Sequence, residues 1–343
     1  MLNRRTLLIL PLALATAGCQ VSSGSSDAGG TSAGTSAANA PAGSSAGTLK
    51  VGLLTNGSLA DSGWNSLAGK GLEQIKQELG AETSHQSGGE AEAEEALRGF
   101  ARDKSRLVFA HGNEFGDAAK RVAQEFPETI FVVSSGEVEG QNLASLKFEL
   151  GEAAYLAGMA SAALSKTGKA GQIGGTSIPP LKQSFALFEK GGREVNPKFT
   201  TTTTYIGNWH DANAGKEKAL AMIRAGADVI FQNADAAGEG VFQAAEEHPG
   251  TLVIGSNANQ NDLKPDLIAM SAVLDVQKSF ASIARQVKDG SFKGGIFTND
   301  LKSGNVYLAL NDKFKSRLPA KVLAKIEKAE ADIKEGRLKL VGQ

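Results

Sequence analysis

The chain has few of the residues that build covalent or metal-held frameworks. Cys19 is the one cysteine in 343 residues, so an intramolecular disulfide and a zinc site of several cysteines are both excluded. There are four histidines, and His111 has no partner cluster in the sequence, which favours a structural role over a metal ligand. The sequence therefore predicts no metal site and no cofactor.

An excess of charge of one sign is also missing. Lys and Arg number 36 against 37 Asp and Glu, a formal net charge of -1. This balance offers no electrostatic footprint for nucleic acid and excludes a polybasic attachment to anionic lipid as the main membrane signal. The 41% hydrophobic and 21% charged content is that of a soluble globular protein, and the length suggests two domains.

The N-terminus has the pattern of a secretory signal peptide. Two arginines precede an apolar run over residues 7–17, which is too short to span a bilayer comfortably as a permanent helix. The run ends in ATAGCQ, which resembles the lipobox of bacterial lipoproteins, although Thr16 stands where a leucine is usual. We expect residues 1–18 to be a lipoprotein signal peptide and Cys19 to carry the lipid. The alternative is a plain secreted protein with an incidental cysteine.

Residues 19–47 form a predicted tether. The stretch after Cys19 is nearly all Ser, Gly, Ala and Thr, and buries too little apolar surface to offset its ordering entropy. We expect a disordered linker that holds a globular body at a membrane, on the periplasmic or extracellular face of the cell. The protein is thus predicted to be exported and anchored to the cell membrane.

The body alternates short apolar strands with amphipathic helices, which predicts an α/β fold with parallel sheets covered on both faces. Predicted strands cover residues 49–57, 106–112, 129–136, 169–175, 201–207, 227–235 and 251–257. Predicted helices cover residues 64–79, 93–104, 116–126, 152–166, 185–196, 213–226 and 239–248. Two successive sets of such units indicate two Rossmann-like lobes of the periplasmic-binding-protein type, class I-like. A ligand is expected in the crevice where the carboxyl ends of the strands meet.

We place lobe 1 at residues 48–150 and lobe 2 at residues 151–270. Residues 271–343 are expected to cross back, complete lobe 1 and form a C-terminal segment.

The loops that follow the strands resemble those of the basic membrane protein family. The resemblance runs from about Leu49 to Gly294, through LADSGWNSLAGKGL, LVFAHGNEFGDAAKRVAQEFP, NLASLKFELGEAAYLAGMAS, KAGQIGGTSIPPLKQSF, YIGNWHDANAGKEKA, GADVIFQNADAAGEGV and IGSNANQND. It implies a solute-binding lipoprotein of an ABC importer for purine nucleosides and related purines. A membrane permease is then the expected protein partner, and the binding protein itself is expected to be a monomer.

Four candidate ligand contacts come from the first lobe. Trp64, beside Asn65, could stack on a base while the amide meets the edge of the base, and the family carries an aromatic–Asn pair there. The alternative is that Trp64 belongs to the core. Asn113 could make a polar contact and Phe115 an apolar wall, or Phe115 could pack on its own lobe.

The second lobe contributes three more candidates. Trp209 lies where the family presents an aromatic from the opposite side, which would complete a sandwich with Trp64. Asp235 and Asn257 follow strands and are placed to meet hydroxyls or ring nitrogens. Asp211, in the same loop as Trp209, is read as a helix cap rather than a ligand contact.

The sequence departs from the family pattern at two positions. The resemblance implies an acidic pair before a glutamine, whose first acid grasps the ribose hydroxyls, and here Asn257 and Asn259 replace that charge. A lysine that the family often has about seventeen residues further on is Leu274 here. Both changes favour a free purine base or another small heterocycle over a nucleoside.

Two other functions share the fold or the ligand. A nucleoside-acting enzyme is disfavoured, because no nucleophile with a base and no metal cluster is evident, and GGTSIPP lacks the Lys-Ser/Thr of a phosphate loop. The protein is therefore predicted not to be an enzyme. A surface receptor, an adhesin or a sensory binding protein remains an alternative.

Overall fold

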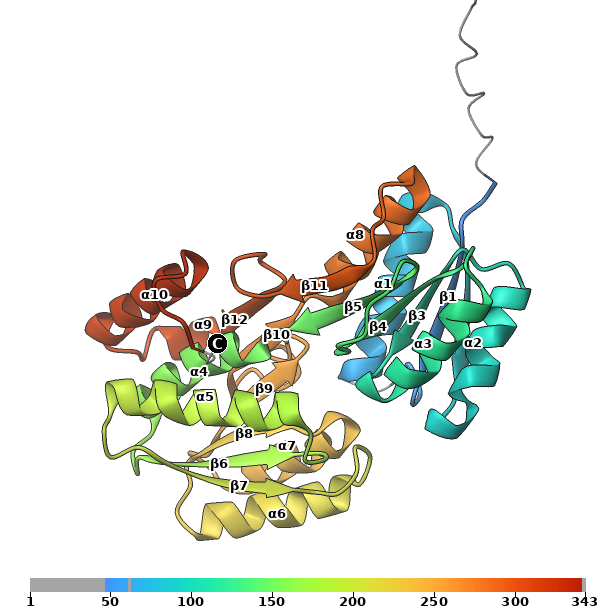
Figure 1. The fold of residues 1–343 in the computed structure, drawn as a ribbon. Coiled ribbons are helices and arrows are strands. Elements are labelled where there is room, and N and C mark those ends of the chain that lie inside the picture. Colours follow the sequence, from blue (N-terminus) through green and yellow to red (C-terminus); the bar gives the residue numbers. More distant parts are fainter. Residues whose placement is uncertain (1–46, 61–62, 341–343) are drawn as a thin grey trace, which may run out of the picture. The chain divides into compact units, whose positions relative to one another are not determined.

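A computed structural model describes residues 47–60 and 63–340 (Figure 1). The predicted signal peptide, Cys19 and the linker up to residue 46 lie outside these residues, as does Asp61 in the landmark that precedes Trp64. No helix among the described residues is long and apolar enough to cross a membrane.

In the described part of the chain, six strands form a first sheet in the order β11-β5-β4-β3-β1-β2, with all neighbours parallel. They are β1 (Lys50–Thr55), β2 (Glu82–Ser87), β3 (Leu107–His111), β4 (Ile130–Ser134), β5 (Leu143–Phe148) and β11 (Gly295–Asn299). Strands β3 and β4 are buried along their whole length, as parallel strands covered on both faces must be.

Helices cover both faces of this sheet. They are α1 (Trp64–Leu79), α2 (Ala93–Arg102), α3 (Gly116–Glu125) and α8 (Val276–Asp289). Helices α1 and α8 lie side by side on one face (Figure 1), although some 200 residues separate them in the sequence. Helices α2 and α3 cover the other face and enclose a separate apolar cluster, which includes Val108 and Ala110 of β3. We call the first sheet and these four helices the first lobe.

Residues 47–340, without 61–62, contain a second six-stranded sheet in the order β12-β10-β9-β8-β6-β7. Its strands are β6 (Lys169–Gly174), β7 (Thr200–Tyr205), β8 (Val229–Asn233), β9 (Leu252–Asn257), β10 (Ile268–Leu274) and β12 (Val306–Leu310). All pairs are parallel except β10 with β12, which is antiparallel. The prediction of an α/β fold with mostly parallel sheets is confirmed.

The second sheet is covered in the same way. Its helices are α4 (Leu150–Leu164), α5 (Pro179–Val195), α6 (Ala212–Arg224) and α7 (Gly238–Glu246). Helices α4 and α5 pack tightly against each other, and a side chain on Gly158 or Gly191 would overlap the backbone of the partner helix. Helices α6 and α7 enclose an apolar cluster on the opposite face. We call the second sheet and these helices the second lobe.

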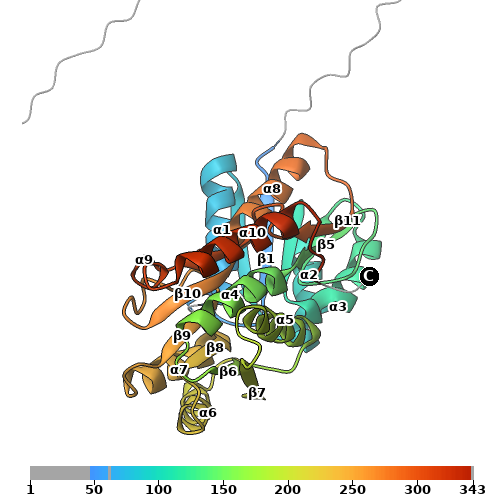
Figure 2. The same ribbon diagram turned by 90° about the vertical axis from the view of Figure 1, so that its left-hand side faces the viewer.

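The chain passes between the lobes after β5, after β10 and after β11. Residues 271–343, expected from the sequence to complete lobe 1, are therefore divided. They supply α8 and β11 to the first lobe, while β12, α9 (Asp312–Lys315) and α10 (Ala320–Lys334) belong to the second. Helix α10 lies along α4, as Figure 2 shows from a second direction.

Candidate ligand-binding site

A cavity of about 360 Å³ lies between the carboxyl ends of the strands of the two sheets. It is at the small end of the range typical of small-molecule sites, roughly 300–1,000 Å³. In each sheet the strand order reverses beside the first strand of the lobe, β1 or β6, and this is where open α/β sheets bind ligands. The described lining residues are Asn56, Trp64, Gly112, Asn113, Glu114, Ser135, Phe148, Leu150, Thr176, Ile178, Pro180, Leu181, Ser184, Trp209, Asn233, Asp235, Asn257 and Leu274.

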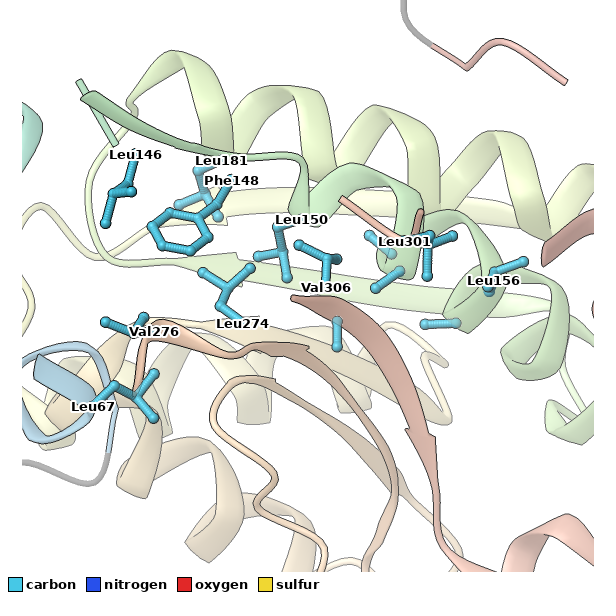
Figure 3. Close-up of a cluster of buried hydrophobic side chains, with 14 of the residues drawn as sticks. Leu67, Leu146, Phe148, Leu150, Leu156, Leu181, Leu274, Val276, Leu301 and Val306 are labelled. Carbon is cyan, nitrogen blue, oxygen red and sulfur yellow. The ribbon is translucent and has the colours of Figure 1, made fainter. Parts of the chain in front are cut away.

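The cavity has an apolar wall where the chain passes from one lobe to the other. Phe148 ends β5, Leu150 begins α4, Leu181 is in the first turn of α5 and Leu274 ends β10. Their side chains gather in Figure 3 and are continuous with the largest buried cluster of the protein. This wall can receive the faces or the hydrophobic edge of a small ring.

Trp64, the first residue of α1, brings an indole to the cavity from the first lobe. One face of the indole stacks on the imidazole of His111, with ring centroids 3.9 Å apart and an interplanar angle of 19°. The Phe148 ring meets it edge-on at 6.2 Å. The indole is half-buried, so a ligand can reach only the part that His111 and Phe148 leave uncovered.

His111, at the end of β3, is fully buried and holds Trp64 in two ways. Besides the stacking, its Nε2 lies 3.0 Å from the Trp64 carbonyl oxygen and its Nδ1 lies 2.8 Å from Ser134 Oγ. A carbonyl only accepts, so Nε2 carries the proton and Nδ1 accepts from the serine hydroxyl. Burial lowers the pKa of His111 to about 3, against the opposing effect of the bond to the Trp64 carbonyl. The ring is therefore neutral at physiological pH.

Trp209 reaches the cavity from the second lobe, in the loop between β7 and α6. Its carbonyl accepts a hydrogen bond from Ala237 N at 3.0 Å, which ties the loop to the segment after β8. Gly175, directly after β6, lies beneath the indole, and any side chain there would overlap the ring. The sequence places a glycine at that point, so the indole can lie flat over the strand end.

Asp235 connects the two lobes at the cavity. Its Oδ1 accepts a hydrogen bond from Trp64 N, the first amide of α1, at 2.5 Å. Helix α1 has no capping side chain from its own N-cap residue, Gly63, and a Cβ on Gly63 would overlap Asp235 Oδ1. A carboxylate at a helix N-terminus satisfies an amide and interacts favourably with the helix dipole. The second lobe thus caps the first helix of the first lobe.

The backbone is strained at three of the lining positions. Ser135, Asp235 and Asn257 have φ values of 56°, 54° and 63°, in the left-handed region that side chains other than Asn and Asp rarely adopt. Ser135 directly follows β4, Asn257 ends β9, and Asp235 lies two residues after the end of β8. Such conformations cluster at ligand sites, where the surrounding structure holds them.

Buried amides support the second-lobe wall. Asn257 Nδ2 donates to Asn233 Oδ1 at 3.3 Å, and both side chains line the cavity. Behind them Gln232 Nε2 donates to Gln260 Oε1 at 2.8 Å, and Gln260 N donates to Ser271 Oγ at 3.1 Å. This network fixes the ends of β8 and β9, so the two asparagines face the cavity in a defined arrangement.

Glu114, in the short 3₁₀ turn Asn113–Phe115 after β3, is the second acidic residue of the cavity wall. Asn56 Nδ2 donates to its Oε1 at 2.5 Å, and the carboxyl group folds back over Gly112. Burial raises the pKa of Glu114, while its own backbone amide and Asn56 oppose that shift. It was not among the candidates from the sequence, because its loop offered no pattern beyond a polar residue before an aromatic.

Of the seven candidate contacts, the structure brings Trp64, Asn113, Trp209, Asp235 and Asn257 together at one cavity. Two candidates do not line it. Phe115 is fully buried in the cluster beneath α2 and α3, and Asn65 is buried beside the loop after β1, next to Gly57. The sequence analysis did not name the other lining residues as contacts; some of them, such as Asn56 and Asn233, directly follow or end a strand, and others lie in the first turns of α4 and α5 or in the loops before them. Asp211 caps α6, with Oδ1 accepting from Ala214 N at 3.0 Å.

The described residues contain no group of three or more His, Cys, Asp or Glu side chains that could hold a metal ion. The arrangement is thus one of stacking surfaces, amides and carboxylates around an apolar wall. It suits capture of a small, flat, polar molecule.

Two lobes of mostly parallel sheet with a cavity at their strand ends are the fold of solute-binding proteins of the periplasmic type. The structure is similar to a solute-binding protein of an ABC transporter system from Aeropyrum pernix K1, with a TM-score of 0.79 and 24% identity over 85% of this chain and 92% of that one. That likeness concerns the fold.

Residues 48–337 match the family described as PnrA-like ABC transporter substrate-binding proteins, and the chain belongs to this Bmp family. It is 28% identical over 361 residues to the ABC transporter nucleoside-binding protein BmpA of Lactococcus lactis, covering 98% of this chain and 99% of that one. It is 28% identical over 294 residues to a purine-binding protein of Brucella abortus, covering 84% and 82%. The protein is therefore a substrate-binding component of an ABC transporter, a class that binds solutes and is not enzymatic.

Proposed function

We propose that the protein captures a purine base or nucleoside-like ligand between its lobes and delivers it to an ABC permease. The observation that carries this proposal is the presence of one indole from each lobe, Trp64 and Trp209, at a single cavity. Aromatic rings stack on any base, and amides such as Asn233 and Asn257 can donate to and accept from the edges of a base. The relatives named for nucleoside and purine binding support the same ligand class.

Within that class the site favours the base. The family resemblance implies an acid that grasps ribose hydroxyls and a lysine beyond it, and the corresponding positions here are Asn257 and Leu274. Both line the cavity, and Leu274 belongs to its apolar wall. An amide is a weaker acceptor for two hydroxyls than a carboxylate.

Calorimetric titration of the purified protein with matched bases and nucleosides tests the proposal. Adenine, guanine and hypoxanthine should bind at least as tightly as adenosine, guanosine and inosine. Tight nucleoside binding without base binding would reverse the ranking, and binding only of sugars or amino acids would remove the purine ligand. Mass spectrometry of solute that copurifies with the protein identifies the natural ligand directly.

The cellular setting is proposed from the sequence pattern and the family. The protein would be exported, acylated at Cys19 and held at the membrane by the lipid and the linker of residues 19–47, beside its permease. A monomer suffices for this role, because each chain carries both walls of the cavity. Export and permease coupling are the working mode of an ABC transporter substrate-binding protein.

A further inference from the structure

The charged groups of the cavity are all acidic. Of the residues that the structure describes, those lining the cavity include two carboxylates, Glu114 from the first lobe and Asp235 from the second, and no Lys, Arg or His. The two carboxylates thus approach a bound ligand from different lobes. Burial of an anion without a cationic partner is costly, and a nearby carboxylate increases that cost.

Helix N-termini are the remaining source of positive potential at the cavity, because several helices begin at the carboxyl ends of strands. The protein's own carboxylates already lie at two of these places. Asp235 Oδ1 accepts from the first amide of α1, and Glu114 folds back over the turn that leads into α3, next to its own amide. A ligand anion would have to compete with them.

The lysines nearest to the lining residues in the sequence do not supply a counter-charge at the wall. Lys147, beside Phe148, forms an ion pair with Glu149 at 3.0 Å. Lys182, beside Leu181 in α5, is exposed and is not among the lining residues. Neither lysine therefore neutralises the carboxylates of Glu114 and Asp235 at the described cavity wall.

We infer that the cavity selects by charge: it accepts neutral or positively charged heterocycles and rejects anionic ones, because Glu114 and Asp235 present negative charge from both lobes and the described lining residues include no cation. The inference rests on the proposed function for the identity of the ring. It excludes nucleotides and oxidised purines such as urate, which is an anion at pH 7, and it admits adenine, guanine and hypoxanthine. A unit negative charge about 6 Å from one carboxylate, at an effective dielectric constant of about 40 for a cavity open to water, weakens binding roughly tenfold, and two such carboxylates weaken it roughly a hundredfold.

Matched ligands test the selectivity. At pH 7, urate should bind at least about a hundredfold more weakly than hypoxanthine, and adenosine 5′-monophosphate more weakly than 5′-methylthioadenosine, which carries neutral bulk at the same position. Asp235→Asn and Glu114→Gln should each reduce the ratio of the urate Kd to the hypoxanthine Kd about tenfold, because each removes a charge and keeps an oxygen acceptor. Glu152→Gln is the control, since Glu152 is a partly buried carboxylate that accepts from Leu301 N and does not line the cavity. Anion binding within about threefold of the neutral partner would overturn the inference.

A second measurement does not depend on purine binding. The two tryptophans of the chain both line the cavity, so fluorescence quenching in the ligand-free protein reports the local potential. When each quenching constant is divided by that measured for free N-acetyltryptophanamide, caesium should quench more strongly than iodide, with neutral acrylamide as reference for exposure, and Asp235→Asn should raise quenching by iodide. If no purine of any charge binds but quenching follows this order, the proposed ligand is wrong and the charge selection stands. Equal quenching by both ions would overturn the charge selection itself.

Discussion

His111 occupies one face of the Trp64 indole, so this tryptophan can offer a ligand only its other face. The stacked pair continues through Phe280, which meets His111 edge-on at 5.7 Å and stacks on Phe109 at 3.8 Å. Trp64 is thus both a part of the core and a surface of the cavity. The sequence left these two readings as alternatives, and a buried column of rings behind a cavity wall reconciles them.

Replacement of either tryptophan should weaken ligand binding. We expect Trp64→Ala and Trp209→Ala each to raise the Kd of a purine roughly tenfold or more, because stacking of a base on an aromatic ring contributes about 1–3 kcal/mol. Trp64→Phe should retain most of the affinity, and Tyr307→Ala removes an exposed ring elsewhere as a control. If Trp64→Ala unfolds the protein while the folded fraction binds as before, the residue acts only in the core.

The buried His111 should make stability depend on pH. Its pKa is lowered to about 3 in the fold, while an unfolded histidine titrates near 6.5. Between these values the unfolded chain binds a proton that the folded chain does not, so the free energy of unfolding decreases as the pH falls. From pH 7.5 to 5 the loss from this residue is about 2 kcal/mol.

Urea unfolding at both pH values checks the effect. His111→Gln keeps a donor that can reach the Trp64 carbonyl and should lose less stability on acidification than the wild type. His248→Gln, at a half-buried histidine outside the cavity, should follow the wild type. Parallel losses in the wild type and His111→Gln would show that other groups set the acid sensitivity.

The sequence predicted which loops reach the cavity better than it predicted which side chains of those loops face it. Trp64, Trp209 and Asn257 line the cavity because the carboxyl end of a parallel strand points there, and this follows from chain order alone. Phe115 comes from the same kind of loop and lies in the core, since a short 3₁₀ turn rotates its side chain away. Which way a loop residue faces depends on backbone dihedrals that composition does not reveal.

At the scale of elements, the contact of α1 with Asp235 is a cap that crosses from one lobe to the other. It forms only if Gly63 has no side chain and if the two lobes lie as close as they do here. The first helix of the binding site is therefore satisfied by the opposite lobe. We therefore expect the lobes to close around a ligand and to complete this helix end in the same movement.

A methyl group at position 63 should hinder closure of the lobes and the contact of Asp235 with α1. We expect Gly63→Ala to weaken ligand binding about tenfold or more, because its Cβ would overlap Asp235 Oδ1 and hold the lobes apart. The change in melting temperature should be small, since the contact lies between lobes. Gly99→Ala in α2, where a Cβ meets nothing within 4 Å, is the matched control and should bind like the wild type.

A double-mutant cycle of Gly63→Ala with Asp235→Ala tests whether the loss of ligand affinity in Gly63→Ala comes from overlap with Asp235. The two losses should not add, because removal of the carboxylate removes the overlap. Fully additive losses in ligand affinity would mean that position 63 acts through something other than Asp235.

Most of the elements that the sequence predicted have a clear period or an unbroken apolar run, although β5 and β10 are buried almost throughout and were not predicted. Strands β3, β4 and β9 are buried at every residue and were predicted from that pattern. Strand β2, ETSHQS, was missed because it is a mostly exposed edge strand and carries no apolar face. Strands β11 and β12 were missed because they are short, partly exposed edge strands. Their place is fixed by partners far away in the sequence.

At the scale of the whole molecule, the lipid anchor is a property of the cell-bound protein rather than of the fold. We expect Cys19→Ala to move the protein from the membrane fraction to a soluble exported fraction, because the cysteine is the proposed site of acylation. Stable anchoring needs more than one acyl chain, and the lipoprotein end provides several. Fractionation and immunoblotting of cells that express either form measure the change. A Cys19→Ala protein that stays with the membrane would rule out this anchor.

The pairing of β5 with β11 also sets the order in which the protein can assemble. Strand β5 ends at Phe148, but its outer neighbour β11 begins at Gly295, so about half of the chain must be synthesised between the two. During that interval the first sheet has an open edge at β5, which is a template for wrong pairing with another chain. Most of the second lobe is made in the same interval, and its sheet also lacks an edge strand until Val306–Leu310 has been synthesised. Neither sheet has all of its strands before residues 295–310 are made, so we expect both lobes to finish folding only when the last fifth of the chain is available.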